Sequence, residues 1–254
     1  MDIPTIQRRA LPPPPGRYST RPSRSQWEAR AQWPAGSRRV CQDHGVVDDW
    51  IRPPQVRPLA GTEHFIGCQA SVVDFWRFAM SDLRVNNVRG YLAEFLVARA
   101  LGATDTRVEW DAYDVLAPDG TKVEVKSSAY LQVWNQRRPS RIVFSGLRGR
   151  TWTPEDGEAL DASYNADVYV FAVQTAQVHD TYDPLDLDQW QFYVLPRTTV
   201  EHLGYNSISL PTLHMLAAAI TYAGLADAVA DAAKNLTATR PPDEGSTQTP
   251  AASL

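Results

Sequence analysis

The sequence predicts an α/β fold in which helices pack against a mixed β-sheet. Three observations support this class: two segments with helical hydrophobic spacing come first, about six segments with strand patterns follow, and three more helical segments come last. With 43% apolar and 21% charged residues among 254, the chain can bury a core of ordinary size. We expect one domain over residues 62–233.

Two helices are predicted at the start of this domain. Residues 71–83 carry apolar side chains at helical spacing, and so do residues 88–101. Asn87 is positioned to cap the second helix, and Gly102 follows its end. Because the second helix is apolar on almost every side, we expect it to be buried between other layers.

The patterns that follow are short and separated by turn residues. The strand patterns cover residues 107–110, 112–117, 121–127, 142–147, 166–175 and 191–195. The last helical patterns cover residues 198–203, 212–221 and 225–235. Strands that lie between two groups of helices predict a mixed sheet covered by helices.

The two ends of the chain are predicted to be largely disordered. The N-terminal arm, residues 1–61, is rich in Arg and Pro, and ten of the 19 prolines precede residue 60. Within it, Trp27 and Trp33 mark a short helix or docking motif, or belong to a plain linker. Residues 234–254 form a similar tail, rich in Thr, Pro, Ser and Ala.

Composition limits the compartment and the class of protein. No run reaches the roughly 18 apolar residues that cross a bilayer, and no apolar stretch follows the N-terminal arginines as in a secretory signal. Cys41 and Cys68 are too few for a disulfide scaffold. We therefore expect a cytoplasmic protein with no membrane partner. The net charge of −4 argues mildly against nucleic-acid binding, although a net value hides the charge distribution.

A predicted β-hairpin brings two carboxylates together. Strand alternation places Val123 and Val125 on one face and Glu124 and Lys126 on the other. If the apolar faces of both strands coincide, the connection is a three-residue Pro-Asp-Gly loop, a common hairpin length. That register sets Asp114 directly across from Glu124, with about 5 Å between the two Cβ atoms.

Two carboxylates this close repel each other, so either one is protonated or a cation lies between them. Oxygen ligands with no Cys or His nearby favour Mg²⁺, with Mn²⁺ as an alternative, over zinc. The ammonium of Lys126 could then orient a water or stabilise charge on a phosphate. The alternative is a solvent-facing strand with an ordinary Glu-Lys pair.

Glu94 is a third acid of interest. It lies on a helix surface between small and apolar residues, where an unpaired charge is costly. One solution is a salt bridge to Arg89 or Arg99, although both lie five residues away on other faces of the helix. The other solution is a place beside the Asp114–Glu124 pair.

Over about residues 88–145, the chain resembles the PD-(D/E)XK nuclease superfamily, the restriction-endonuclease-like fold. The resemblance rests on the helix acid Glu94, the strand acid Asp114, a turn, and the Glu-x-Lys pair Glu124 and Lys126. It departs at Tyr113, which stands where the family's motif has proline, and Asp111 is a rival for the first strand acid. The fold that this resemblance implies is a three-layer α/β/α sandwich.

The resemblance also implies an activity, the metal-dependent hydrolysis of a phosphodiester. Asp114, Glu124 and the carbonyl of Val125 would hold Mg²⁺, and Glu94 would help directly or through water. Lys126 would orient the attacking nucleophile.

A basic segment follows the motif. Residues 127–150 contain no acid and five arginines, with aromatic side chains just before them. Such a segment suits a phosphate backbone, and the predicted nucleic-acid contacts are Tyr130, Trp134, Arg137, Arg138 and Arg141. Gln132 and Gln136 could extend the site. The alternative is a solvated basic loop.

We weigh three functions. The leading one is a Mg²⁺-dependent DNA endonuclease in defence or repair, which could work as a homodimer. The second is a catalytically silent domain of the same fold that binds nucleic acid or a protein partner. The third is an α/β interaction domain in which the Glu-x-Lys pattern is accidental.

Overall fold

The computed structural model describes residues 57–104, 107, 112–153 and 157–237. These residues belong to one compact unit that begins at Val56. Most of the arm expected over residues 1–61 and of the tail expected over 234–254 lies outside the described residues. The last helix continues to Thr237, past the expected end of the domain at residue 233.

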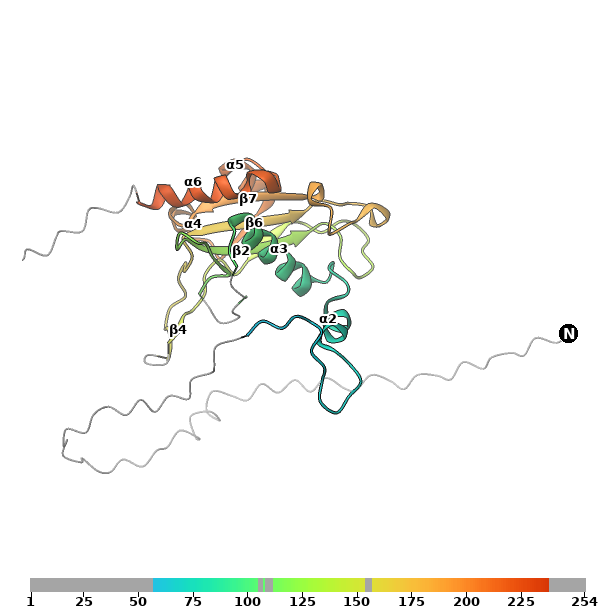
Figure 1. The fold of residues 1–254 in the computed structure, drawn as a ribbon. Helices are drawn as coiled ribbons and strands as arrows, with labels where there is room; N and C mark the ends of the chain where they lie inside the picture. The colour runs from blue at the N-terminus through green and yellow to red at the C-terminus, as the bar shows by residue number, and fades with distance from the viewer. Residues whose placement is uncertain (1–56, 105–106, 108–111, 154–156, 238–254) are drawn as a thin grey trace, which may run out of the picture. The chain divides into compact units, whose positions relative to one another are not determined.

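The core of the fold is a four-stranded mixed sheet (Figure 1). Its strands are β1 (Val115–Leu116), β2 (Lys122–Ala129), β6 (Val168–Gln174) and β7 (Trp190–Pro196), in that spatial order. The strands β2 and β6 run parallel, and the two outer pairs are antiparallel. The predicted mixed sheet is therefore confirmed.

The hairpin between β1 and β2 has the predicted register. Val115 pairs with Val123, and the N–H of Ala117 donates to the carbonyl of Thr121 across a three-residue loop. Gly120 ends this loop with a φ of +88°, in the left-handed region that favours glycine. The strand β1 is shorter than the expected 112–117, and the strand expected at 107–110 lies almost entirely outside the described residues.

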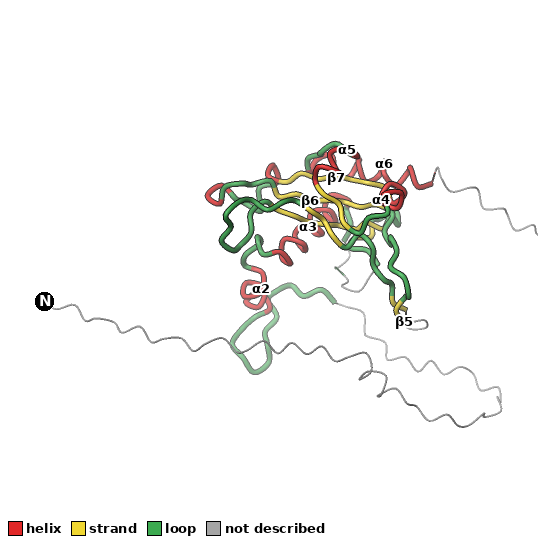
Figure 2. Tube along the Cα trace, turned by 180° about the vertical axis from the view of Figure 1, so that it is seen from behind, coloured by secondary structure: helices red, strands yellow, loops and turns green. Residues whose placement is uncertain are grey.

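Two helices cover one face of the sheet, α3 (Asn86–Leu101) and α6 (Leu225–Thr237). Figure 2 shows both beside the strands from the opposite side. Their apolar side chains form one core cluster with the inward side chains of the strands, which include Val97, Val123, Val125, Val170 and Leu225. The alternate residues of β2, among them Glu124 and Lys126, therefore face the other side of the sheet.

The second face is covered by a mixed layer. It consists of α4 (Arg197–Leu203), α5 (Leu210–Leu216) and a two-stranded sheet of β3 (Val143–Ser145) and β8 (Ser207–Ser209). A second core cluster fills this side, in which the Phe144 and Phe171 rings meet edge to face. The α/β sandwich is confirmed. The strand expected at 142–147 differs from expectation, because it leaves the central sheet to pair with β8.

The helix α3 differs from the prediction in two ways. It begins at Asn86 because the N–H of Arg89 donates to the carbonyl of Val85, so the expected cap at Asn87 is wrong. It is also not buried on all sides, since Tyr91 is 38% and Phe95 57% exposed. The side of α3 that faces the sheet and α6 contributes its core residues, and an apolar side chain alone does not determine which side that is.

The remaining elements are short. The helix α2 (Val72–Met80) begins at a capping box of Ser71 and Asp74. The helix α5 starts at a Ser209 cap and ends before the expected residue 221. Three 3₁₀ turns and a small hairpin complete the fold: His179–Thr181, Leu187–Gln189, Tyr222–Gly224, β4 (Trp152–Thr153) and β5 (Gly157–Glu158). Within the described ranges, no helix combines the length and apolar character that a membrane crossing requires.

Two glycine substitutions test the hairpin geometry. We expect Gly120→Ala to lower the free energy of unfolding by about 1 kcal/mol, because the φ of +88° strains an L-residue although no atom lies within 4 Å of the new Cβ. Gly90→Ala in the interior of α3 is the control. It meets no atom within 4 Å and is expected to stabilise the helix by about 0.5–1 kcal/mol. Thermal unfolding of both variants measures the difference, and a Gly120→Ala protein as stable as wild type would contradict the turn assignment.

Candidate active site

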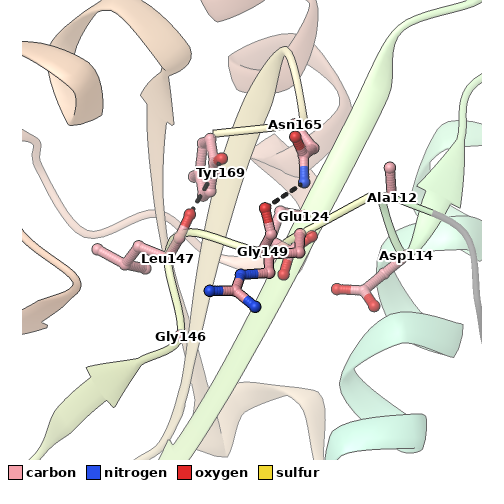
Figure 3. A pocket seen from close by; sticks show the side chains of 9 residues that line it. Ala112, Asp114, Glu124, Gly146, Leu147, Gly149, Asn165 and Tyr169 are labelled. Carbon is pink, nitrogen blue, oxygen red and sulfur yellow. Dashed lines mark hydrogen bonds between the residues drawn. The ribbon is translucent and has the colours of Figure 1, made fainter. Parts of the chain in front are cut away.

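The predicted strand acids line one pocket. Asp114 lies one residue before β1, and Glu124 lies in β2. The same pocket is lined by both side chains, and Figure 3 shows their carboxylates directed into a common space. The hairpin register produces this convergence. Val115 pairs with Val123 in an antiparallel ladder, so Asp114, one residue earlier, lies opposite Glu124, one residue later.

Asp114 is fastened to β2 by two hydrogen bonds. Its N–H donates to the carbonyl of Val123 (3.0 Å), and its Oδ2 accepts from the N–H of Val125 (2.7 Å). The N–H and C=O of one strand residue project to the same side of the strand. The carbonyl of Val125 is therefore directed to the side of β2 on which Asp114 lies.

Glu124 carries a charge that its surroundings disfavour. Its side chain is 17% exposed, and its carboxylate forms an ion pair with Lys126. Burial, followed by the negative charge of Asp114, raises the pKa of Glu124, while the ammonium of Lys126 acts in the opposite direction. A cation between the two carboxylates would remove this conflict.

Glu94 has a partner that the sequence did not indicate. Its carboxylate forms an ion pair with Arg107, whose guanidinium lies 4.5 Å from the centre of the Tyr91 ring. The expected partners are different: Arg89 is buried and donates to the carbonyl of Arg84.

Glu94 also interacts electrostatically with the predicted site. Its side chain is 13% exposed. Burial and then the charge of Asp114 raise the pKa of Glu94, whereas Arg107 and Lys126 lower it. Glu94 thus has a salt bridge, but to Arg107 and not to Arg89 or Arg99, and the charges of Asp114 and Lys126 reach it.

The three acids do not form one cluster. Within residues 57–237, leaving aside the undescribed gaps, no three Asp, Glu, His or Cys side chains lie close enough together to hold an ion. The rival acid Asp111 lies outside the described residues. Mg²⁺ commonly keeps several waters and takes only one or two carboxylates from the protein. Asp114, Glu124 and the carbonyl of Val125 fit that donor chemistry.

The opposite wall of the pocket was not predicted from the sequence. It consists of Gly146, Leu147, Gly149 and Arg150, which follow β3, together with Asn165 and Tyr169. Tyr169 pairs with Glu124 in the β2–β6 ladder, and its hydroxyl donates to the carbonyl of Leu147 (3.3 Å). Asn165 donates to the carbonyl of Gly149 (3.1 Å), and Figure 3 shows both bonds. Because these contacts depend on pairing between distant segments, no local pattern could identify them.

The predicted nucleic-acid residues lie elsewhere. Trp134 is 55% exposed, Tyr130 is half-buried, and Arg137, Arg138 and Arg141 are exposed. Residue 130 is six residues beyond Glu124, about 20 Å along an extended strand. The structure therefore does not bring these five residues into the pocket, although Arg150, at the end of the same basic segment, lines it.

Two glutamines shape the basic segment. The Oε1 of Gln136 accepts from the N–H of Gln132 (2.7 Å), and the Nε2 of Gln136 donates to the carbonyl of Tyr130 (3.3 Å). The Nε2 of Gln132 donates to the carbonyl of Ala129. These side chains hold the loop that follows β2, which is a different role from the predicted extension of the acidic site.

The comparison with protein families gives one match. The family model described as Bacteriophage T4 endonuclease IV matches residues 78–211. This range is just over half of the chain, and it contains Glu94, Asp114, Glu124 and Lys126. The search of curated proteins finds no match.

The repulsion at the pocket can be tested through stability. We expect Glu124→Gln to raise the melting temperature at pH 7 without metal by roughly 2–4 °C, the shift that about 1 kcal/mol produces in a domain of this size. The direction follows from the raised pKa of Glu124: the folded protein disfavours the charged form of this carboxyl relative to the unfolded chain, and glutamine cannot ionise. Glu201→Gln removes an exposed carboxylate and should change the melting temperature little. A lower melting temperature for Glu124→Gln would mean that its ion pair with Lys126 outweighs the repulsion.

Proposed function

The chain belongs to the bacteriophage T4 endonuclease IV family, and from that premise we propose that it is a divalent-metal-dependent endodeoxyribonuclease with a centre of the PD-(D/E)XK type. The family supports cleavage within a nucleic acid, with DNA as the substrate. The observation that carries the metal-dependent centre is the shared pocket of Asp114 and Glu124, with Lys126 two residues along the same face of β2.

The proposed metal ligands are the carboxylates of Asp114 and Glu124 and the carbonyl of Val125. Glu94 would contribute through water, since its carboxylate pairs with Arg107 and joins no three-acid group among the residues that the structure describes. When bound, Mg²⁺ lowers the pKa of a coordinated water and neutralises charge on the phosphate. Mn²⁺ has the same ligand preference.

Lys126 is the proposed positioning cation. Its ammonium pairs with Glu124, so it lies beside the proposed ligand set, and its side chain is 25% exposed. An ammonium has three donors on a flexible stem, so Lys126 can keep one bond to Glu124 and donate another to the attacking water.

A second candidate function is a silent domain of the same fold that binds DNA or a protein. One observation favours it: each acid except Asp114 already has a cationic partner from the protein, Lys126 for Glu124 and Arg107 for Glu94. If these pairs persist in solution, two of the three carboxylates are neutralised without a metal. Activity and metal binding separate the two functions.

Cleavage tests the proposal. Purified protein is incubated with supercoiled plasmid and with single-stranded and duplex oligonucleotides, in Mg²⁺ and in EDTA. We expect Mg²⁺-dependent cutting that falls by about 10²–10⁴-fold in Lys126→Ala, the usual range for a lost general acid–base or charge-stabilising group. Asp114→Asn should behave similarly.

The matched control for cleavage is Lys234→Ala, which removes an exposed ammonium on α6 and should leave the rate unchanged. Cutting that survives both Lys126→Ala and Asp114→Asn would contradict the assignment of activity to this pocket. Binding of DNA without cutting of any of these substrates would support the silent domain.

The basic segment gives a separate prediction about binding. Replacing Arg137, Arg138 and Arg141 together by Ala should lower the slope of log affinity against log salt concentration by about 2–3, because each phosphate contact contributes about 0.7–0.9 to the slope. Arg77→Ala, in the exposed helix α2, is the single-charge control. Fluorescence anisotropy with a labelled oligonucleotide measures the slopes, and an unchanged slope in the triple variant would exclude this segment from the DNA interface.

A further inference from the structure

An arginine lies in the opposite wall of the pocket that Asp114 and Glu124 share. Arg150 borders the same pocket as Asp114 and Glu124, although it follows them by more than 25 residues in the sequence. Figure 3 shows the wall to which it belongs, around Leu147 and Gly149, across the pocket from Asp114. A phosphate held by a metal at the two acids would therefore have a guanidinium on its other side.

The backbone that carries Arg150 is fixed to the central sheet. Gly149 and Ser163 exchange two N–H to carbonyl bonds of 2.9 Å each. The side chain of Asn165 donates to the carbonyl of Gly149, and the hydroxyl of Tyr169 donates to that of Leu147. Since Tyr169 is in β6, which pairs with β2, the segment before Arg150 is tied to the strand that carries Glu124. A backbone held in this way need not be ordered further when its side chain binds a ligand.

The side chain of Arg150 has only a weak ion pair. Its Nη1 lies 3.7 Å from Glu158, and both side chains are at least half exposed (51% and 64%). An exposed ion pair of this kind contributes roughly 0–1 kcal/mol. Arg150 can therefore leave Glu158 and bind a phosphate at a small cost in free energy. The neighbouring Arg148 is different, because it donates to the carbonyl of Gly204 and lies over the ring of Tyr164. Arg148 therefore has structural contacts that stabilise the fold.

Two other cations near the pocket are already paired with acids, which leaves Arg150 to bind a phosphate. Lys126 pairs with Glu124, and Arg107 pairs with Glu94, so both cations are on the acidic side. We propose that Arg150 binds the non-bridging oxygens of the phosphate that is cut. A guanidinium matches two phosphate oxygens with two parallel hydrogen bonds, and it is strongest where negative charge accumulates in the transition state.

This inference rests on the proposed function and extends it to the substrate. Arg150 would take up no proton and form no covalent bond; it would bind and orient one backbone phosphate. A contact to phosphate carries no information about base sequence. The predicted role is therefore the same for every sequence that the protein cuts.

Kinetics and binding test the inference with four variants. Cleavage of an oligonucleotide in Mg²⁺ gives kcat and KM for Arg150→Ala, Arg150→Lys, Glu158→Gln and the control Arg99→Ala. We expect Arg150→Ala to lower kcat by about 10²–10³-fold and to change KM much less, as for the loss of a donor that acts in the transition state. Arg150→Lys should recover only part of kcat, because a point charge replaces a planar fork. Glu158→Gln and Arg99→Ala should match wild type.

A binding measurement makes the test independent of turnover. In the Asp114→Asn background, Arg150→Ala should lower the slope of log affinity against log salt concentration by about 1, and Arg99→Ala should leave it unchanged. Melting temperatures of all variants within about 2 °C of their parents would exclude misfolding, as exposed substitutions rarely cost more.

The outcomes separate the inference from the proposed function. If wild type cuts DNA and Arg150→Ala matches Arg99→Ala in both measurements, the role of Arg150 is wrong and the nuclease stands. If Glu158→Gln reproduces the loss seen in Arg150→Ala, the ion pair and not a phosphate contact is responsible, and the inference fails. If no DNA is cut but the slope still falls by about 1, the phosphate contact is supported and the nuclease is overturned.

Discussion

The burial of Val123 and Val125 against α3 and α6 is the constraint on which the site depends. Once these side chains face that core, the two-residue period of a strand sends Glu124 and Lys126 to the opposite face. The pairing of β1 with β2 is then limited to the register that buries apolar side chains on the same face, which carries Asp114 to Glu124. The acidic pocket is thus a consequence of apolar packing.

The closeness of the buried carboxylates lowers the stability of the folded protein. Burial raises the pKa of both Glu94 and Glu124, and the charge of Asp114 adds to the effect in each case. Lys126 and Arg107 offset part of this repulsion. Like charges held together at a cost in stability are typical of functional sites.

The sequence predicted the hairpin and its acids because the information was local. Asp114 and Glu124 are ten residues apart, and alternation together with a turn defines their register. The second wall of the pocket depends on the β2–β6 and β3–β8 ladders, which join residues more than 40 positions apart. The Arg107 partner of Glu94 was missed for a related reason: residue 107 was predicted only as the start of a strand, and side-chain direction cannot be read from a helix whose sequence is apolar on most sides.

The central claim is that the carboxylates of Asp114 and Glu124 share one divalent ion. Crystals grown with Mn²⁺ and measured near its absorption edge would locate the metal by anomalous scattering. We expect a peak about 2.0–2.3 Å from an oxygen of each carboxylate, close to the octahedral distances of hard divalent ions. A fully ordered pocket with no peak at saturating metal would contradict it.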